Sequence, residues 1–293
     1  MENKPYTTKA KASFALLGGG IFFGISSPFS RMMGKWLAPF SVVFIRFLFA
    51  LPFALGFFLK GEKVEKLPYK KLVGFALLFP ISVCLYTFSL FYTKVSIAIF
   101  SFYIANLIAS IIIGIFWNKE KLFGKKLFGF ILAIVAVLIL TNPFQGFVVS
   151  AGMLLGYLSG IFQSIASLYQ KRLSKSVNER VLTLTQVMGG LFVGLISIFF
   201  IKDGSIFMIT GHGLLLGLVF GFLFFLINYL MIYGFKYADI GIGTILLSSE
   251  LVFGPIAAYL IFNETLSGLE ILGGILIAIA VVFVSLHKDT VSV

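Results

Sequence analysis

The sequence predicts an all-α integral membrane protein. Of its 293 residues, 59% are hydrophobic and only 12% are charged, whereas an ordinary soluble domain is about half apolar and about one quarter charged. Several apolar runs exceed the roughly 18 residues that mark a bilayer-spanning helix. The short breaks between these runs carry most of the lysines and arginines. These three observations predict a multi-pass protein with no room for a separate soluble domain.

Ten apolar segments are expected to cross the membrane. They lie near residues 12–30, 39–59, 72–92, 96–117 and 127–141, and then near 151–170, 181–201, 213–235, 240–262 and 269–286. If the N-terminus is cytoplasmic, 18 of the 23 lysines and arginines fall on the cytoplasmic side, 4 fall on the other side, and Arg46 lies inside a span. Because cytoplasmic loops of membrane proteins are enriched in Lys and Arg, both termini are expected on that side.

The net charge of +12 does not indicate a nucleic-acid partner, because the cations lie in short clusters at the ends of apolar runs. Cys84 lies within a span and is the single cysteine, so we expect a packed thiol and no internal disulfide. No phosphate-binding loop of the G-x-x-x-x-G-K-[ST] type is present, which argues against ATP-driven transport by this chain alone. His212 and His287 are isolated, so neither a metal site nor a cofactor is expected.

Short matches indicate an internal repeat. Lys119-Glu120-Lys121-Leu122 with Gly129 matches Asn263-Glu264-Thr265-Leu266 with Gly273 at an offset of 144, and Gly20-Ile21-Phe22 matches Gly160-Ile161-Phe162 at an offset of 140. The expected halves are residues 1–145 and 146–293, each with five spans. An odd number of spans inverts the second half relative to the first, and inverted repeats commonly build an alternating-access site at the midplane.

Five places in the sequence resemble the EamA-type transporters of the drug/metabolite transporter superfamily. They are Phe23-Gly24, Pro39 with Phe44-Ile45-Arg46-Phe47, Tyr92-Thr93-Lys94, the Glu-x-Leu signatures at Glu120 and Glu264, and Glu250, which lies 14 residues before Glu264. Many members of the family have Leu-Glu-Pro at the last place; here Leu251 follows the glutamate and the proline is displaced to Pro255. The resemblance implies a secondary transporter of a small metabolite.

Glu250 is the first candidate site residue. It lies about ten residues into its span, and its counterpart at an offset of 144 is Asn106 in the fourth span. A carboxylate near the midplane is costly unless it has a partner or faces a cavity, so such groups are functional candidates. It is expected to bind a substrate ammonium or to couple transport to a proton. The alternative is a protonated, packed side chain bonded to neighbouring backbone or to Ser248 and Ser249.

Arg46 is the second candidate, because it is the only cation well inside a span. A guanidinium can bind a substrate carboxylate through two parallel hydrogen bonds. It can also reach the outer interface or pair with Glu250. The other candidates for the lining of a central cavity are Tyr86, Tyr103, Gln163, Gln186, Asn228 and Tyr229. For each of these, a hydrogen bond between helices is the alternative. Glu120 and Glu264 are expected to fix the turns after the fourth and ninth spans.

The expected function is secondary transport of an amino acid or a related zwitterionic or cationic solute, by export or exchange, through alternating access. The expected partners are the lipid bilayer, the small-molecule substrate, and a coupling proton or counter-substrate; the oligomeric state stays open. The expected location is a bacterial cytoplasmic membrane. The alternatives are a carrier of nucleotide sugars, quaternary amines or drugs, a channel, and a membrane-embedded lipid enzyme, although the chain shows no motif of an enzyme.

Overall fold

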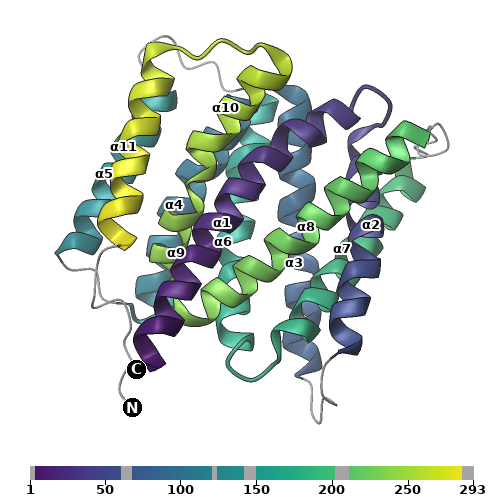
Figure 1. Cartoon of the computed structure of the whole chain (residues 1–293), viewed down its shortest axis with the longest axis horizontal. Coiled ribbons are helices and arrows are strands. Elements are labelled where there is room, and N and C mark those ends of the chain that lie inside the picture. The colour runs from purple at the N-terminus through teal and green to yellow at the C-terminus, as the bar shows by residue number, and fades with distance from the viewer. Residues whose placement is uncertain (1–3, 61–67, 121–123, 142–149, 202–210, 286–293) are drawn as a thin grey trace.

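The structure is a computed structural model that describes residues 4–60, 68–120, 124–141, 150–201 and 211–285, and within these ranges it is all-helical (Figure 1). The helices are α1 (Lys4–Met33), α2 (Pro39–Leu59), α3 (Tyr69–Tyr92), α4 (Val95–Asn118), α5 (Lys125–Thr141), α6 (Ala151–Leu173), α7 (Glu179–Ile201), α8 (Gly211–Tyr237), α9 (Ile240–Leu247), α10 (Glu250–Phe262) and α11 (Gly268–Ser285).

Each predicted span lies on one of these helices, except that the ninth is divided into α9 and α10. Eight segments are long and apolar enough to cross a membrane, with the ninth counted as one segment, Ile240–Phe262. The other two helices, α5 and α11, carry shorter apolar stretches, Leu127–Ile139 and Ile271–Phe283. A count of ten spans therefore stays a prediction, as does the cytoplasmic position of the termini. The expected boundary between residues 145 and 146 lies outside the described residues.

The helix ends show the repeat in the backbone itself. α4 and α10 are followed by the C-cap residues Lys119 and Asn263, whose φ angles are 54° and 53°. Among the described residues, these two are the only non-glycine residues with positive φ. A left-handed residue of this kind is a common way to terminate a helix. The offset of 144 in the sequence thus corresponds to two equal helix ends, each followed by the signature glutamate.

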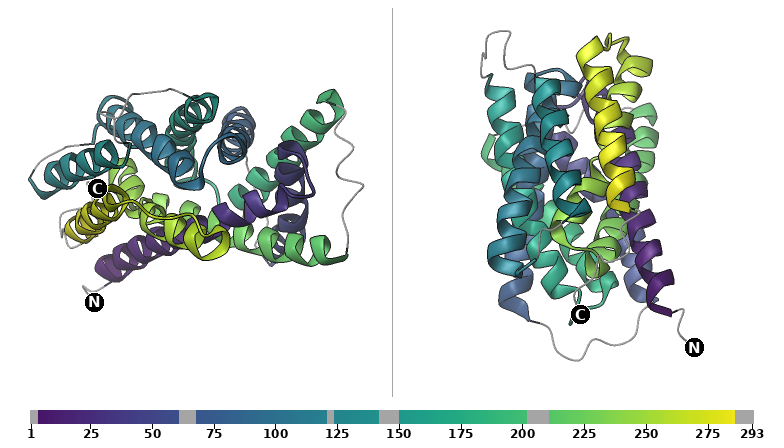
Figure 2. Two further views of the ribbon diagram at one scale, coloured as in Figure 1. Left: turned by 90° about the horizontal axis from the view of Figure 1, so that it is seen from above. Right: turned by 90° about the vertical axis from the view of Figure 1, so that its left-hand side faces the viewer.

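The two halves pack against each other in a reciprocal way. α1 packs along α8, α9 and α10, whereas its counterpart α6 packs along α3 and α4. Other cross-half contacts join α2 with α7 and α8, α3 with α7, α4 with α9 and α10, and α5 with α11. Figures 1 and 2 show α5 and α11 together at one edge of the molecule, with α2, α7 and α8 at the opposite edge.

The second sequence match marks two close contacts between the halves. Gly20 lies against the backbone carbonyl of Leu247, and Gly160 lies against that of Phe102. A side chain at either glycine would collide with this backbone, so glycine is required for the approach. Tyr103 and Leu247, which are counterparts at an offset of 144, touch directly: the Tyr103 hydroxyl donates to the Leu247 carbonyl over 2.8 Å. An approximate two-fold axis therefore passes between α4 and α9.

Candidate functional site

The candidate site begins where the ninth span is interrupted. α9 ends at Leu247 and α10 begins at Glu250, so Ser248 and Ser249 separate the two helices. The Leu251 amide bonds the Ser248 carbonyl over 2.8 Å, a three-residue spacing that tightens the chain locally. This shift frees the Leu247 carbonyl for Tyr103. Because the proline is displaced, the sequence alone does not locate the break in the ninth span. In the structure the break lies directly before Glu250.

Glu250 is completely buried at the first residue of α10. Its Oε1 accepts a hydrogen bond from the Tyr86 hydroxyl at 2.6 Å and another from the Ser27 hydroxyl at 3.1 Å. Its Oε2 has no hydrogen-bond partner among the described residues. The neighbouring serines bond elsewhere, since Ser248 donates to the Ile245 carbonyl and Ser249 to the Leu17 carbonyl. The carboxylate is therefore held by α1 and α3 rather than by its own turn.

Arg46 is also buried, with 3% of its surface exposed, so it does not reach the outer interface. Its Nη2 donates to the Ser30 hydroxyl over 2.5 Å, and its guanidinium lies over the rings of Phe220 and Phe224 at 4.7 and 5.0 Å from their centres. Its Nε has no hydrogen-bond partner among the described residues. Arg46 and Glu250 form no ion pair with each other in the described part of the chain.

One face of α1 joins the two charged groups. Ser27 bonds Glu250 and Ser30 bonds Arg46. Three residues of helix rise by about 4.5 Å, so the carboxylate and the guanidinium are held about one turn apart. Each has one polar atom still to be satisfied. We call Ser27, Ser30, Arg46, Tyr86 and Glu250 the charged cluster; it brings a buried carboxylate and a buried guanidinium onto the same face of α1.

The counterparts of these residues form a neutral set. At an offset of 140 from Ser27, Ser30 and Arg46 lie Ser167, Gln170 and Gln186, and the counterpart of Glu250 is Asn106. We call these four residues the neutral counterpart. Asn106 accepts a hydrogen bond from Ser164 over 2.7 Å, whereas both amide atoms of Gln170 and of Gln186 are buried without a partner among the described residues. The repeat thus supplies two equivalent groups of positions, and only one of them carries charge.

The remaining predicted residues divide between these regions. Tyr103 lies on the approximate axis. Gln163 accepts a hydrogen bond from Ser82 over 3.4 Å between α6 and α3. Asn228 donates to the carbonyl of its own helix at Phe224, and its Oδ1 has no partner among the described residues. Tyr229 is half-buried and its ring contacts Phe57 and Tyr233, so the structure does not join it to the charged cluster.

The two signature glutamates form ion pairs at the helix ends. Glu264 pairs with Arg31 of α1, and Glu120 pairs with Lys171 of α6 over 3.1 Å. Arg31 and Lys171 are themselves counterparts at an offset of 140. Each glutamate therefore joins the end of one half's fourth span to the end of the other half's first helix. The sequence predicts that these glutamates fix the turns, and the structure adds an ion pair with the other half for each of them. The sequence gives no local sign of these pairs, because the partners lie far away along the chain.

The two ends differ in how tightly they are closed. Lys171 contacts Glu120 and Asp239, and the side chains of these three residues are 10%, 4% and 10% exposed. Glu120 also accepts a hydrogen bond from the Ile240 amide at 2.8 Å. The side chains of the Arg31–Glu264 pair are 35% and 19% exposed. This pair borders a cavity of about 440 Å³ lined also by Gly34, Lys35, Phe91 and Phe262. The Lys171 end is the more tightly closed.

Two stretches of the chain, residues 10–142 and 150–286, each match the model of the EamA-like transporter family. The chain belongs to this family. It is thus an EamA-type membrane transporter of the drug/metabolite transporter superfamily, with one match in each repeat. No curated protein matches the sequence.

Solved structures share the fold of this EamA-like transporter. One of them, described only as a crystal structure of a protein, has a TM-score of 0.72 over 93% of this chain and 98% of its own, with 15% sequence identity. At that identity the likeness concerns the fold alone. Within the described ranges, no three His, Cys, Asp or Glu side chains lie together as a metal site requires.

In this EamA-like transporter, sequence reasoning missed Ser27 and Ser30 in the charged cluster and the cations Arg31 and Lys171 at the ends. Serines in membrane helices often bond their own backbone, and the single hydroxyl proton of Ser27 is shared between the Phe23 carbonyl and Glu250. The cations were counted only as markers of topology. The offset of 140 that aligns Gly20 with Gly160 also aligns Ser27 with Ser167, Ser30 with Gln170 and Arg31 with Lys171. This alignment is the one signal in the sequence that points to these four site and end residues.

Proposed function

We propose that this EamA-like transporter moves a small zwitterionic or cationic solute, of the amino-acid type, by export or exchange. The observation that carries the proposal is the charged cluster. It contains a buried carboxylate and a buried guanidinium that are not paired with each other, and each keeps one atom that has no partner among the described residues. A ligand with an ammonium and a carboxylate group complements both.

The energetics of burial support a zwitterion. A buried charge without an opposite charge is strongly unfavourable, whereas a paired and hydrogen-bonded one is tolerated. Glu250 has two neutral donors, and Arg46 has one hydroxyl and two aromatic rings. A substrate ammonium at Oε2 and a substrate carboxylate at Nε supply the missing opposite charges. When the substrate leaves, Glu250 is neutralised by a proton or the charged cluster takes up a counter-substrate. Substrate transport is thereby coupled to the movement of that proton or counter-substrate.

Alternating access follows from the two ion pairs at the ends. Each pair joins the fourth span of one half to the first helix of the other. Rocking of the repeats would break one pair while the other stays closed, with the charged cluster between them. The interruption before Glu250 is suited to act as a hinge, since short tightened segments within helices often do so.

The orientation belongs to the same proposal. The repeats, residues 1–145 and 146–293, are inverted, and both termini face the cytoplasm of a bacterial cell. The Lys171 end is then cytoplasmic, because the positive-inside pattern places Lys171 and Arg172 there. The Arg31 end faces outward, and its greater exposure corresponds to a carrier that is more open on the outside.

The test is counterflow in proteoliposomes with a panel of amino acids, quaternary amines and nucleotide sugars. We expect saturable exchange of at least one amino-acid-like solute. Glu250→Gln and Arg46→Ala should each lower its rate about 30-fold or more, because truncating one partner of a buried charge contact is costly. The matched control is Glu179→Gln, which removes a carboxylate that pairs with Lys236 at a helix end.

Three outcomes would overturn the proposal. One is folded wild-type protein that moves none of the panel. A second is normal exchange by both site variants. The third is exchange of a quaternary amine that needs Glu250 and not Arg46, which would replace the zwitterion by a cation without a carboxylate and would assign Arg46 a packing role.

A further inference from the structure

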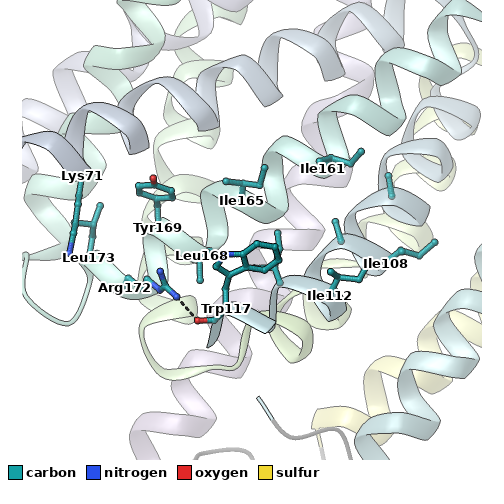
Figure 3. Close-up of a pocket in the computed structure, with 13 residues that line it drawn as sticks. Lys71, Ile108, Ile112, Trp117, Ile161, Ile165, Leu168, Tyr169, Arg172 and Leu173 are labelled. Atoms are coloured by element: carbon teal, nitrogen blue, oxygen red, sulfur yellow. Dashed lines mark hydrogen bonds between the residues drawn. The ribbon is translucent and has the colours of Figure 1, made fainter. Parts of the chain in front are cut away.

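A long groove lies on the outside of the bundle, between α4 and α6 and reaching the start of α3. It has a volume of about 740 Å³. Most of its lining is aliphatic: Ala105, Ile108, Ala109, Ile112 and Ile113 come from α4, and Ile161, Ile165 and Leu168 come from α6. Figure 3 shows the isoleucines of this lining at positions 108, 112, 161 and 165, together with Leu168. Such a surface suits a hydrocarbon chain.

One end of the groove is different in character. Lys71, in the first turn of α3, and Arg172, in the last turn of α6, lie there with Tyr169 (Figure 3). Arg172 donates to the carbonyl of Trp117, whose indole also lines the groove. Both cations are exposed, and none of the described residues that line the groove is acidic. Aromatic residues with lysine or arginine are typical of the level of the lipid head groups.

We propose that this groove binds an anionic phospholipid, with an acyl chain along α4 and α6 and the phosphate between Lys71 and Arg172. Charge complementarity selects this occupant. The positive-inside pattern places these two cations at the cytoplasmic leaflet, which is rich in anionic lipid. A second copy of the chain fits poorly, because two-fold symmetry about the membrane normal places the same residues of both copies at one depth, so the cations would face each other.

Two comparisons within the molecule show that this charge is particular to the groove. At the equivalent places in the other half, Met32 stands for Arg172 and Ile261 stands for Trp117. A second external groove of about 520 Å³, between α2, α3 and α7, has no charged side chain among the described residues that line it. An apolar lining is expected for any groove on the lipid-facing surface, and it occurs in both grooves. The cations at one end are found neither at the equivalent place in the other half nor among the described lining residues of the second groove.

The bound lipid would lie beside the more tightly closed end. Arg172 follows Lys171, the cation that Glu120 and Asp239 hold. α4 and α6 also carry the close Gly160–Phe102 contact. A lipid that spans both helices therefore stabilises this pair of helices across the two halves.

The test measures retention of lipid by purified protein in detergent, by native mass spectrometry. The probes are phosphatidylglycerol and phosphatidylcholine with the same acyl chains. The wild type should retain phosphatidylglycerol in preference. The double variant Lys71→Gln/Arg172→Gln should weaken that binding about 30-fold, as expected for the loss of two cations near an anionic head group. The matched double variant Lys70→Gln/Lys175→Gln removes two exposed cations at the same end that do not line the groove.

A third variant tests the acyl chain. Ala109→Phe fills the floor of the groove and leaves the cations in place, so it should lower phosphatidylglycerol retention while the protein's thermal midpoint without lipid is unchanged. Equal loss in the two double variants would mean diffuse attraction to the basic surface. Equal retention of the two lipids by the wild type would overturn the site, and so would normal binding by Ala109→Phe, which would leave only a head-group contact.

Discussion

The charged cluster and its neutral counterpart occupy equivalent positions in the repeat but carry different chemistry. Glu250 corresponds to Asn106, and Arg46 corresponds to Gln186. The helix packing around them is similar in the two halves, since Gly20 and Gly160 each approach a backbone carbonyl of the other half, at positions that differ by one residue. The shared backbone therefore has an approximately two-fold arrangement, whereas the charged cluster lies on one side of the axis only; we propose that this side is the binding site.

The largest expected effect of this difference in charge is on the rate of substrate counterflow. Gln186→Ala and Asn106→Ala should lower counterflow by less than about tenfold, because each removes neutral hydrogen-bonding groups. The corresponding changes at Arg46 and Glu250 should cost about 30-fold or more, since they remove a charged group from a buried contact. The measurement is the initial rate of exchange at saturating substrate, with the amount of folded protein matched by its thermal transition.

Equal losses at the two members of each pair would contradict the comparison. They would mean that the substrate contacts both groups, as it would in a site centred on the axis itself. In that case Tyr103, which lies on the axis, would become the next residue to change.

A second effect is expected on the free energy of unfolding, and it compares the ion pairs at the Lys171 end and at the Arg31 end of the bundle. Lys171→Met leaves the buried carboxylates of Glu120 and Asp239 without their cation, which should lower the free energy of unfolding by about 3 kcal/mol. Arg31→Met leaves only Glu264, in a partly exposed pair, so about 1 kcal/mol or less is expected. Equilibrium unfolding by denaturant in one detergent gives both values. Equal losses would show that the difference in exposure between the ends has no energetic consequence.

The sequence was sufficient for the helices and for the repeat. Apolar runs mark where helices lie because a bilayer admits few other structures, and Lys119 and Asn263 mark equivalent helix ends. It was insufficient for pairing between distant helices. The partner of Glu120 is Lys171, and nothing local to either residue points to the other. Applying the offsets of 140 and 144 to every polar residue is the only way in which the sequence relates Arg31 to Lys171 and Glu120 to Glu264.

The last effect concerns the shared backbone, where the two glycine changes are expected to cost the same and so to differ least from each other. Gly20→Ala and Gly160→Ala each place a methyl group against a backbone carbonyl of the other half, so each should lower the free energy of unfolding by about 1–3 kcal/mol. Gly18 is the matched control on α1, since an added methyl group there would meet only Leu230, at 3.8 Å. Gly18→Ala should be neutral or stabilising, because alanine favours a helix by up to about 1 kcal/mol over glycine. If Gly20→Ala were costly and Gly160→Ala neutral, the close approach would matter in one half only, and the asymmetry would extend from the side chains to the backbone.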